Sequence, residues 1–201
     1  MQNLNIAKAT GPDDIPARVI KVAAKQLAPS FTSVVNNCIT QGIFPFDMKK
    51  ADITPVYKKL DLLMKDNYRP VSVLCTLAKL FEHILANQLN SHFNKIFDKF
   101  ISAYRKMYSC ENILTSVIDL WRGALDKNMV VGSVLMDLSM AFDCLPHRLL
   151  IAKLKAYNVS NSACTLIASY LTGRRQRVKV TGQKSGVQHE KVYPKGVGLG
   201  P

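Results

Sequence analysis

Residues 134–143 read Val134-Leu135-Met136-Asp137-Leu138-Ser139-Met140-Ala141-Phe142-Asp143. The apolar run that ends at Asp137 predicts a buried strand over residues 130–137. An aspartate at the end of a strand is rigidly placed, and its carboxylate can bind a divalent cation such as Mg2+, which prefers oxygen ligands. The alternative is that Asp137 only caps the turn that follows the strand. The flanking sequence is needed to distinguish a metal-binding role of Asp137 from a turn-capping one.

The composition indicates a folded chain with an anionic partner. The chain has 201 residues, of which 48% are hydrophobic, enough for a core of one domain or a large part of one. Lysine and arginine number 27 against 14 acidic residues, which gives a net charge of +13. Such a charge favours nucleic acid, although an anionic membrane surface would be attracted in the same way.

The cysteines and histidines indicate neither disulfides nor a transition-metal site. The 5 cysteines form no C-x-x-C pair, and the 4 histidines form no H-E-x-x-H motif. We find no signal peptide pattern and no apolar run long enough for a transmembrane helix. We therefore expect an intracellular protein, cytoplasmic or nuclear, that does not contact a membrane.

Helical and strand patterns alternate along the chain. We expect one helix after Pro16, a second after Pro29 that ends near Gly42, and a short edge strand or extended segment over 51–57. A turn at 66–70 leads into a strand, and a long helix follows over about 76–96. Later helices are expected after the capping residue Ser109, after Pro146, and from about Ser160 to Leu171. This order predicts one continuous α/β unit.

The last part of the chain is strongly basic. Alternating valines after Arg174 suggest a hairpin about Gly182 or Gly186. The basic residues on this pattern suit a phosphate backbone, whereas a charge run is often only a solvated face. The candidate nucleic-acid-binding residues are Arg174, Arg175, Arg177, Lys179 and Lys195.

Several blocks resemble, in order, the reverse transcriptases of non-LTR (LINE-type, jockey-like) retrotransposons. One is Asn67-Tyr68-Arg69-Pro70-Val71-Ser72, and another is Met136-Asp137-Leu138-Ser139-Met140-Ala141-Phe142-Asp143. The others lie at residues 8–16, 51–59, 78–82, 102–112 and 170–178. Each block alone is weak, but the set runs in the family's order and covers nearly the whole chain.

This resemblance implies an α/β (α+β) right-hand polymerase fold. It places the fingers at residues 1–128 and the first part of the palm at 129–201, with no thumb. It also implies an RNA-directed DNA polymerase, a nucleotidyltransferase encoded by a transposable element. Its partners would be an RNA template, a DNA primer and deoxynucleoside triphosphates, and its cofactor would be Mg2+, with two ions in the intact family.

The same resemblance assigns roles to individual residues. Asp137 would be the catalytic, metal-binding carboxylate, and the carbonyl of Leu138 would be a second ligand. Phe142 would exclude a ribose 2′-hydroxyl, the group that distinguishes RNA from DNA building blocks. Arg69 and Lys79 resemble the cations that hold the incoming triphosphate. For Lys79, a solvated helix lysine is the alternative.

Two departures from the family pattern affect the expected activity. Lys195 stands where the Gly-rich block of the family has glutamine, which puts nucleotide selection in question. The sequence also ends before the hairpin on which the family carries its paired aspartates. Because one carboxylate does not hold two Mg2+ ions, we expect this fragment to be inactive.

Two other hypotheses remain open at this point. The chain could be a non-enzymatic remnant that binds nucleic acid through residues 174–195, with salt-sensitive affinity. It could also fail to fold stably, because a palm sheet without partner strands leaves an unpaired edge.

Overall fold

The computed structural model describes residues 1–64, 67–98, 100–105, 107–137, 145–180, 183–184 and 189–190. The chain divides into two compact units, which we describe separately. The first comprises Met1–Ala86 and Ala141–Val197, and the second comprises Asn87–Met140 and Gly198–Pro201. The predicted site residues Leu138, Phe142 and Lys195 lie outside the described residues.

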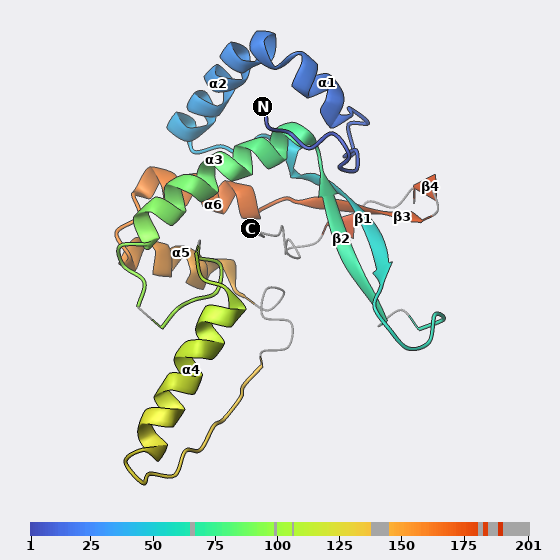
Figure 1. The fold of residues 1–201 in the computed structure, drawn as a ribbon. Helices are drawn as coiled ribbons and strands as arrows, with labels where there is room; N and C mark the ends of the chain where they lie inside the picture. The colour runs from blue at the N-terminus through green and yellow to red at the C-terminus, as the bar shows by residue number, and fades with distance from the viewer. Residues whose placement is uncertain are drawn as a thin grey trace. The chain divides into compact units, whose positions relative to one another are not determined.

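The first unit is built on a mixed sheet (Figure 1). Strand β1 (Lys50–Tyr57) pairs antiparallel with β2 (Tyr68–Leu74) and parallel with β3 (Arg175–Val180). The short strands β4 (Gln183–Lys184) and β5 (His189–Glu190) both pair antiparallel with β3. The pairing of β4 with the end of β3 confirms the predicted hairpin, whose connection at residues 181–182 contains Gly182.

The prediction that 51–57 is an edge strand is wrong, because β1 lies between β2 and β3. A proline is tolerated in this central strand because β3 pairs only with residues 50–53 of β1, so Pro55 lies beyond that ladder. On the other side Pro55 faces Pro70, directly next to the pair of Val56 and Arg69 in a regular antiparallel register. Neither proline has an N–H to leave unpaired there.

The N-terminal helices break at a different residue from the one expected. Helix α1 (Ala17–Val22) ends at Ala23, and helix α2 (Ala24–Gln41) contains Pro29 within its second turn. The prediction of a break at Pro29 is therefore wrong; the backbone leaves helical geometry at Ala23, where ψ is 11°. The predicted end of the helix is confirmed, since Gly42 adopts a left-handed conformation with φ 67° and closes α2.

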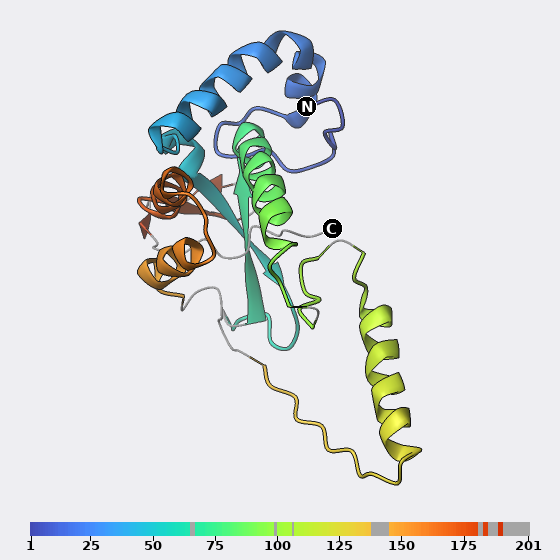
Figure 2. The same cartoon turned by 90° about the vertical axis from the view of Figure 1, so that its left-hand side faces the viewer.

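A hydrophobic core forms where α2, helix α3 (Thr76–Phe93) and helix α6 (Asn161–Leu171) meet. It contains buried Val35, Phe44, Phe81 and Leu166, and the rings of Phe44 and Phe81 stack with their centroids 4.9 Å apart. Figures 1 and 2 show α2, α3 and α6 gathered at one end of the sheet, with helix α5 (His147–Ala156) beside α6. The helices expected after Pro146 and from Ser160 to Leu171 are confirmed as α5 and α6.

The N-terminal loop approaches the sheet very closely at Gly11. A Cβ atom at this position would lie 2.5 Å from both the Cα and the backbone N of Cys75, at the end of β2. Only glycine allows two backbones to come this near. This contact brings the next residue, Pro12, alongside the sheet.

The second unit contains helix α4 (Cys110–Leu125), which begins at the predicted cap. The hydroxyl of Ser109 accepts a hydrogen bond of 3.2 Å from the backbone N–H of Asn112. The predicted strand over 130–137 is wrong, because residues 129–137 pair with no strand among the described residues and Leu135 is 97% exposed. A single strand gains no stability without a hydrogen-bonded neighbour, whatever its apolar content.

The described residues therefore form a mixed α/β structure, as the sequence predicted. None of the helices in this part of the chain is both long and apolar enough to cross a membrane.

Candidate nucleic-acid interface and metal ligand

One face of the sheet carries most of the predicted cations. Side chains alternate between the two faces along a strand, and residues in register on neighbouring strands point the same way. Arg175 is in register with Lys50, Arg177 with Asp52, and Val56 with Arg69. The opposite face carries Ala51 and Leu74, which pack with Ala78 of α3 in the core. The outer face therefore presents cations along both β2 and β3.

A buried carboxylate anchors this face. The side chain of Asp52 is only 2% exposed, and it accepts hydrogen bonds from Nε of Arg177 at 2.5 Å and from Nη2 at 3.3 Å. Nη2 of Arg177 also donates to the carbonyl of Pro12 at 3.3 Å. The bonds to Asp52 raise the pKa of Arg177. Arg177 is thus held in a fixed orientation by groups from the first loop and from β1.

Arg174 serves the core rather than the surface. It is buried, lies 3.9 Å from the Glu82 carboxylate and stacks its guanidinium 4.6 Å from the centroid of Tyr170. The phenol of Tyr170 donates to the same carboxylate at 2.7 Å. Burial raises the pKa of Glu82, an effect opposed by the Tyr170 hydrogen bond and the charge of Arg174. The first arginine of the basic run is therefore a buried residue with structural contacts, not part of a solvated face.

The two predicted triphosphate cations differ in their surroundings. Arg69 is exposed on β2, on the same sheet face as Arg177. Lys79 lies in the first turn of α3 and is half-buried; burial and the charge of Lys8 lower its pKa. Burial distinguishes Lys79 from a fully solvated helix lysine.

Asp137 belongs to the second unit and its side chain is exposed. Among the described residues, no three histidine, cysteine, aspartate or glutamate side chains gather in a group that could hold a metal ion. Asp137 therefore supplies one carboxylate, which does not by itself fit a centre of two Mg2+ ions.

Sequence reasoning missed Asp52, Lys50 and Phe46. The local signal for Asp52 was a single acidic residue within a segment of β-forming residues. This signal was not sufficient, because the partner of Asp52, Arg177, lies 125 positions away in the sequence. Phe46 lies in the 3-10 helix η1 (Phe46–Lys49) just before β1, and Lys50 and Arg175 both approach its ring, at 5.4 Å and 4.9 Å from the centroid. No local pattern indicates this three-residue contact.

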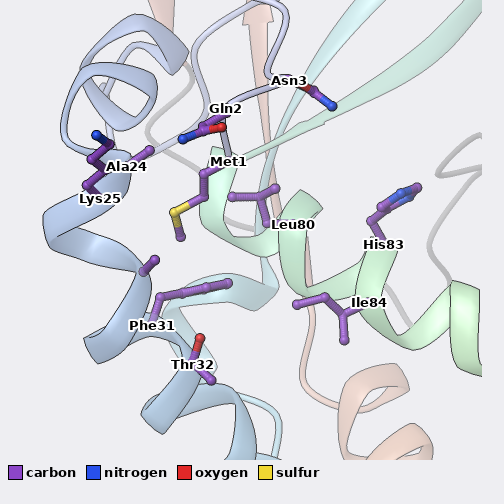
Figure 3. Close-up of a pocket in the computed structure, with 11 residues that line it drawn as sticks. Met1, Gln2, Asn3, Ala24, Lys25, Phe31, Thr32, Leu80, His83 and Ile84 are labelled. Atoms are coloured by element: carbon purple, nitrogen blue, oxygen red, sulfur yellow. The ribbon is translucent and has the colours of Figure 1, made fainter.

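One cavity among the described residues lies away from this face. It has a volume of about 610 Å3 and is lined by apolar and polar residues of the N-terminus, α2 and α3, among them Met1, Phe31 and His83 (Figure 3). None of the predicted site residues lines it.

Comparison with known proteins gives the family. Residues 49–201 match the family model described as reverse transcriptase (RNA-dependent DNA polymerase). The whole chain is 29% identical to the RNA-directed DNA polymerase from mobile element jockey of Drosophila funebris, of which it covers 22%. It is 26% identical, over its whole length, to a probable RNA-directed DNA polymerase from transposon BS of Drosophila melanogaster, again covering 22% of that protein.

The chain is also 26% identical over its whole length to the retrovirus-related Pol polyprotein from the type-1 retrotransposable element R1 of Bradysia coprophila, of which it covers 20%. The chain spans about a fifth of the length of these relatives. This chain belongs to the reverse transcriptase (RNA-dependent DNA polymerase) family and corresponds to part of the polymerases of non-LTR retrotransposons.

Proposed function

We propose that this chain is the part of an RNA-directed DNA polymerase that binds the incoming nucleotide and the primed template. The supporting observation is the cationic sheet face, on which Arg69 of β2 and Arg175, Arg177 and Lys179 of β3 point the same way. Phosphate groups of nucleic acid are bound by such arrays of arginine and lysine. In a right-hand polymerase, residues 1–128 would be the fingers and 129–201 the beginning of the palm.

Within this proposal Arg69 and Lys79 hold the triphosphate of the nucleotide, and Phe142 contacts its sugar. Arg69 is suited to the role because its exposed planar guanidinium can bond two phosphate oxygens at once. Lys195 would contact the template beside the Gly-rich segment.

Asp137 and the carbonyl of Leu138 would be ligands of Mg2+ when residues 130–137 pair with further palm strands. Mg2+ supplies charge stabilisation for phosphoryl transfer at such a centre. The printed sequence contains no aromatic-x-Asp-Asp motif after Asp137. We therefore expect the 201 residues alone to bind nucleic acid without extending a primer.

Primer extension on an RNA template with Mg2+ tests this function. Neither the unmutated chain nor Asp137→Ala should extend the primer. A longer chain, translated from the DNA that follows the codon for Pro201 and carrying an aromatic-x-Asp-Asp motif, should extend it, and Asp137→Asn in that chain should abolish extension. Extension by the 201-residue chain would overturn the proposed need for further carboxylates. A folded longer chain that binds primed template but does not extend it would overturn the assignment as a polymerase.

A second candidate is a non-enzymatic nucleic-acid-binding protein. It is supported by the fact that the described cations of β2 and β3 all lie in the first unit, whereas Asp137 lies in the second. It predicts binding that Asp137→Asn leaves unchanged and downstream DNA without the paired aspartates.

A further inference from the structure

Three side chains converge where β1 and β3 begin. Lys50 and Arg175 are the first residues of these strands and are in register. Both place their cationic groups near the ring of Phe46, which is 46% exposed. The shared ring brings two positive charges together that would otherwise repel each other, because each is attracted to the face of the ring.

A small cleft lies beside this cluster. Its volume is about 150 Å3, and its lining includes Lys50, Arg175, Arg177 and the carboxylate of Asp52. Three cationic side chains and one carboxylate are among the lining residues, so the lining of the cleft is cationic on balance. Since liquid water occupies about 30 Å3 per molecule, the cleft has room for a group the size of a phosphate.

The cleft already has a nearby anion that can be displaced. The carboxylate of Asp47 is 86% exposed and pairs with the ammonium of Lys50 at 2.6 Å. An exposed pair of this kind contributes little, of the order of 0–1 kcal/mol. A phosphate that contacts Lys50 and Arg175 together can therefore replace the carboxylate of Asp47.

The cleft is separate from the position proposed for the nucleotide triphosphate. Arg69 is in register with Val56, six residues along β1 from Lys50. At about 3.3 Å per residue this corresponds to roughly 20 Å along the strand. A triphosphate at Arg69 does not span that distance, whereas a nucleic acid strand does.

We propose that the cleft between Lys50, Arg175 and Arg177 is a subsite for one backbone phosphate of a single-stranded nucleic acid. Asp52 and Arg177 both line the cleft and are bonded to each other, so a phosphate would contact Lys50 and Arg175 from the solvent side, which a flexible single strand allows more readily than a stiff duplex. This inference rests on the proposed function only in taking the ligand to be nucleic acid. The phosphate chemistry is shared by nucleic acid strands and by free triphosphates, and the experiment separates the two sources.

The test measures binding of a labelled oligouridine of about 15 nucleotides, a length that a single-strand-binding module covers, at several salt concentrations. Lys50→Gln and Arg175→Gln should each weaken binding and lower the magnitude of the slope of log K against log salt by about 0.7. The matched control Lys155→Gln removes the same charge from an exposed position on α5 and should leave the slope unchanged. Asp47→Asn should tighten binding about two- to fivefold, because it removes the competing carboxylate.

Circular dichroism of each variant establishes that it is folded before its binding is compared. Unchanged oligouridine affinity in both Lys50→Gln and Arg175→Gln would overturn the subsite while leaving the proposed function intact. Absence of binding by the unmutated chain at low salt would instead contradict the proposed function. A parallel titration with dTTP should be unaffected by Lys50→Gln, and a loss confined to dTTP would show a triphosphate site and overturn the proposal.

Discussion

The phenol of Tyr170 donates a hydrogen bond of 2.7 Å to the carboxylate of Glu82, although 88 residues separate them in the sequence. This bond joins α6 to α3 beside the stacked rings of Phe44 and Phe81. The other oxygen of Glu82, Oε2, is buried without a hydrogen-bond partner among the described residues. The carboxylate therefore depends on Tyr170 and on the charge of Arg174.

Tyr170→Phe should lower the free energy of unfolding by about 1–3 kcal/mol, because it leaves a buried carboxylate without its donor. Urea denaturation measures this change. Tyr108→Phe is the control, since the exposed ring of Tyr108 keeps its contact with Arg105 after the hydroxyl is removed. Equal effects of the two substitutions would contradict the importance of the Tyr170 bond.

The contribution of Tyr170 to stability should depend on pH in the alkaline range. Burial and the nearby charge of Glu82 raise the pKa of Tyr170 in the folded chain. The unfolded chain loses this proton above about pH 10 while the folded chain retains it, so stability is fully present below that pH and falls as the pH rises. The difference in unfolding free energy between the unmutated chain and Tyr170→Phe should shrink by about 1.4 kcal/mol between pH 8 and pH 11, most of it above pH 10. Urea denaturation at pH 8, 10 and 11 tests this. If the difference in unfolding free energy between the two proteins stayed constant over these pH values, Tyr170 would ionise equally in the folded and the unfolded chain.

Arg177→Met should destabilise the first unit by about 3–5 kcal/mol, because it leaves the Asp52 carboxylate buried without a counter-charge. The double variant Asp52→Val with Arg177→Met should recover much of this loss, since two apolar side chains leave no buried charge. Thermal and chemical denaturation measure both. Arg18→Met, at an exposed position of α1, is the control for loss of one arginine. A double variant as unstable as Arg177→Met alone would be evidence against the buried-charge explanation.

Gly11→Ala should destabilise the chain, because the new Cβ would meet the backbone of Cys75 at 2.5 Å and neither backbone can move without loss of packing. Gly123→Ala is the matched substitution, in α4, where no atom lies within 4 Å of an added Cβ. It should raise helix stability by about 0.5–1 kcal/mol. Circular dichroism during thermal unfolding compares the two, and a neutral Gly11→Ala would show that the loop can withdraw from β2.

Local sequence rules were sufficient wherever an element is stabilised by its own residues. The caps Ser109 and Ser160 and the left-handed Gly42 mark helix ends, because their hydrogen bonds are made within a few residues of the chain. The order of motifs was equally informative, and the family match over residues 49–201 agrees with it.

Local sequence rules gave wrong predictions where the structure of a segment depends on residues that are distant in the sequence. Pro55 suggested an edge strand, but β3, more than 100 positions later, covers the first half of β1. The apolar run 130–137 satisfies the pattern of a buried strand and yet has no paired neighbour among the described residues. In both cases the local pattern shows only that the segment can form a strand. Whether it does so, and whether it lies at the edge or inside a sheet, depends on the neighbouring strand.

The sequence by itself determined the α/β class, most of the helix boundaries, the net charge of +13 and the family. These follow from periodicity, capping, charge and motif order, all of which can be read along the chain. The tertiary structure alone decided that Arg174 is buried against Glu82, that Arg177 is fixed by Asp52, and that Lys50 and Arg175 meet at Phe46. These contacts join residues up to 125 positions apart, and the register of β1 against β3 brings together those of Arg177 with Asp52 and of Arg175 with Lys50.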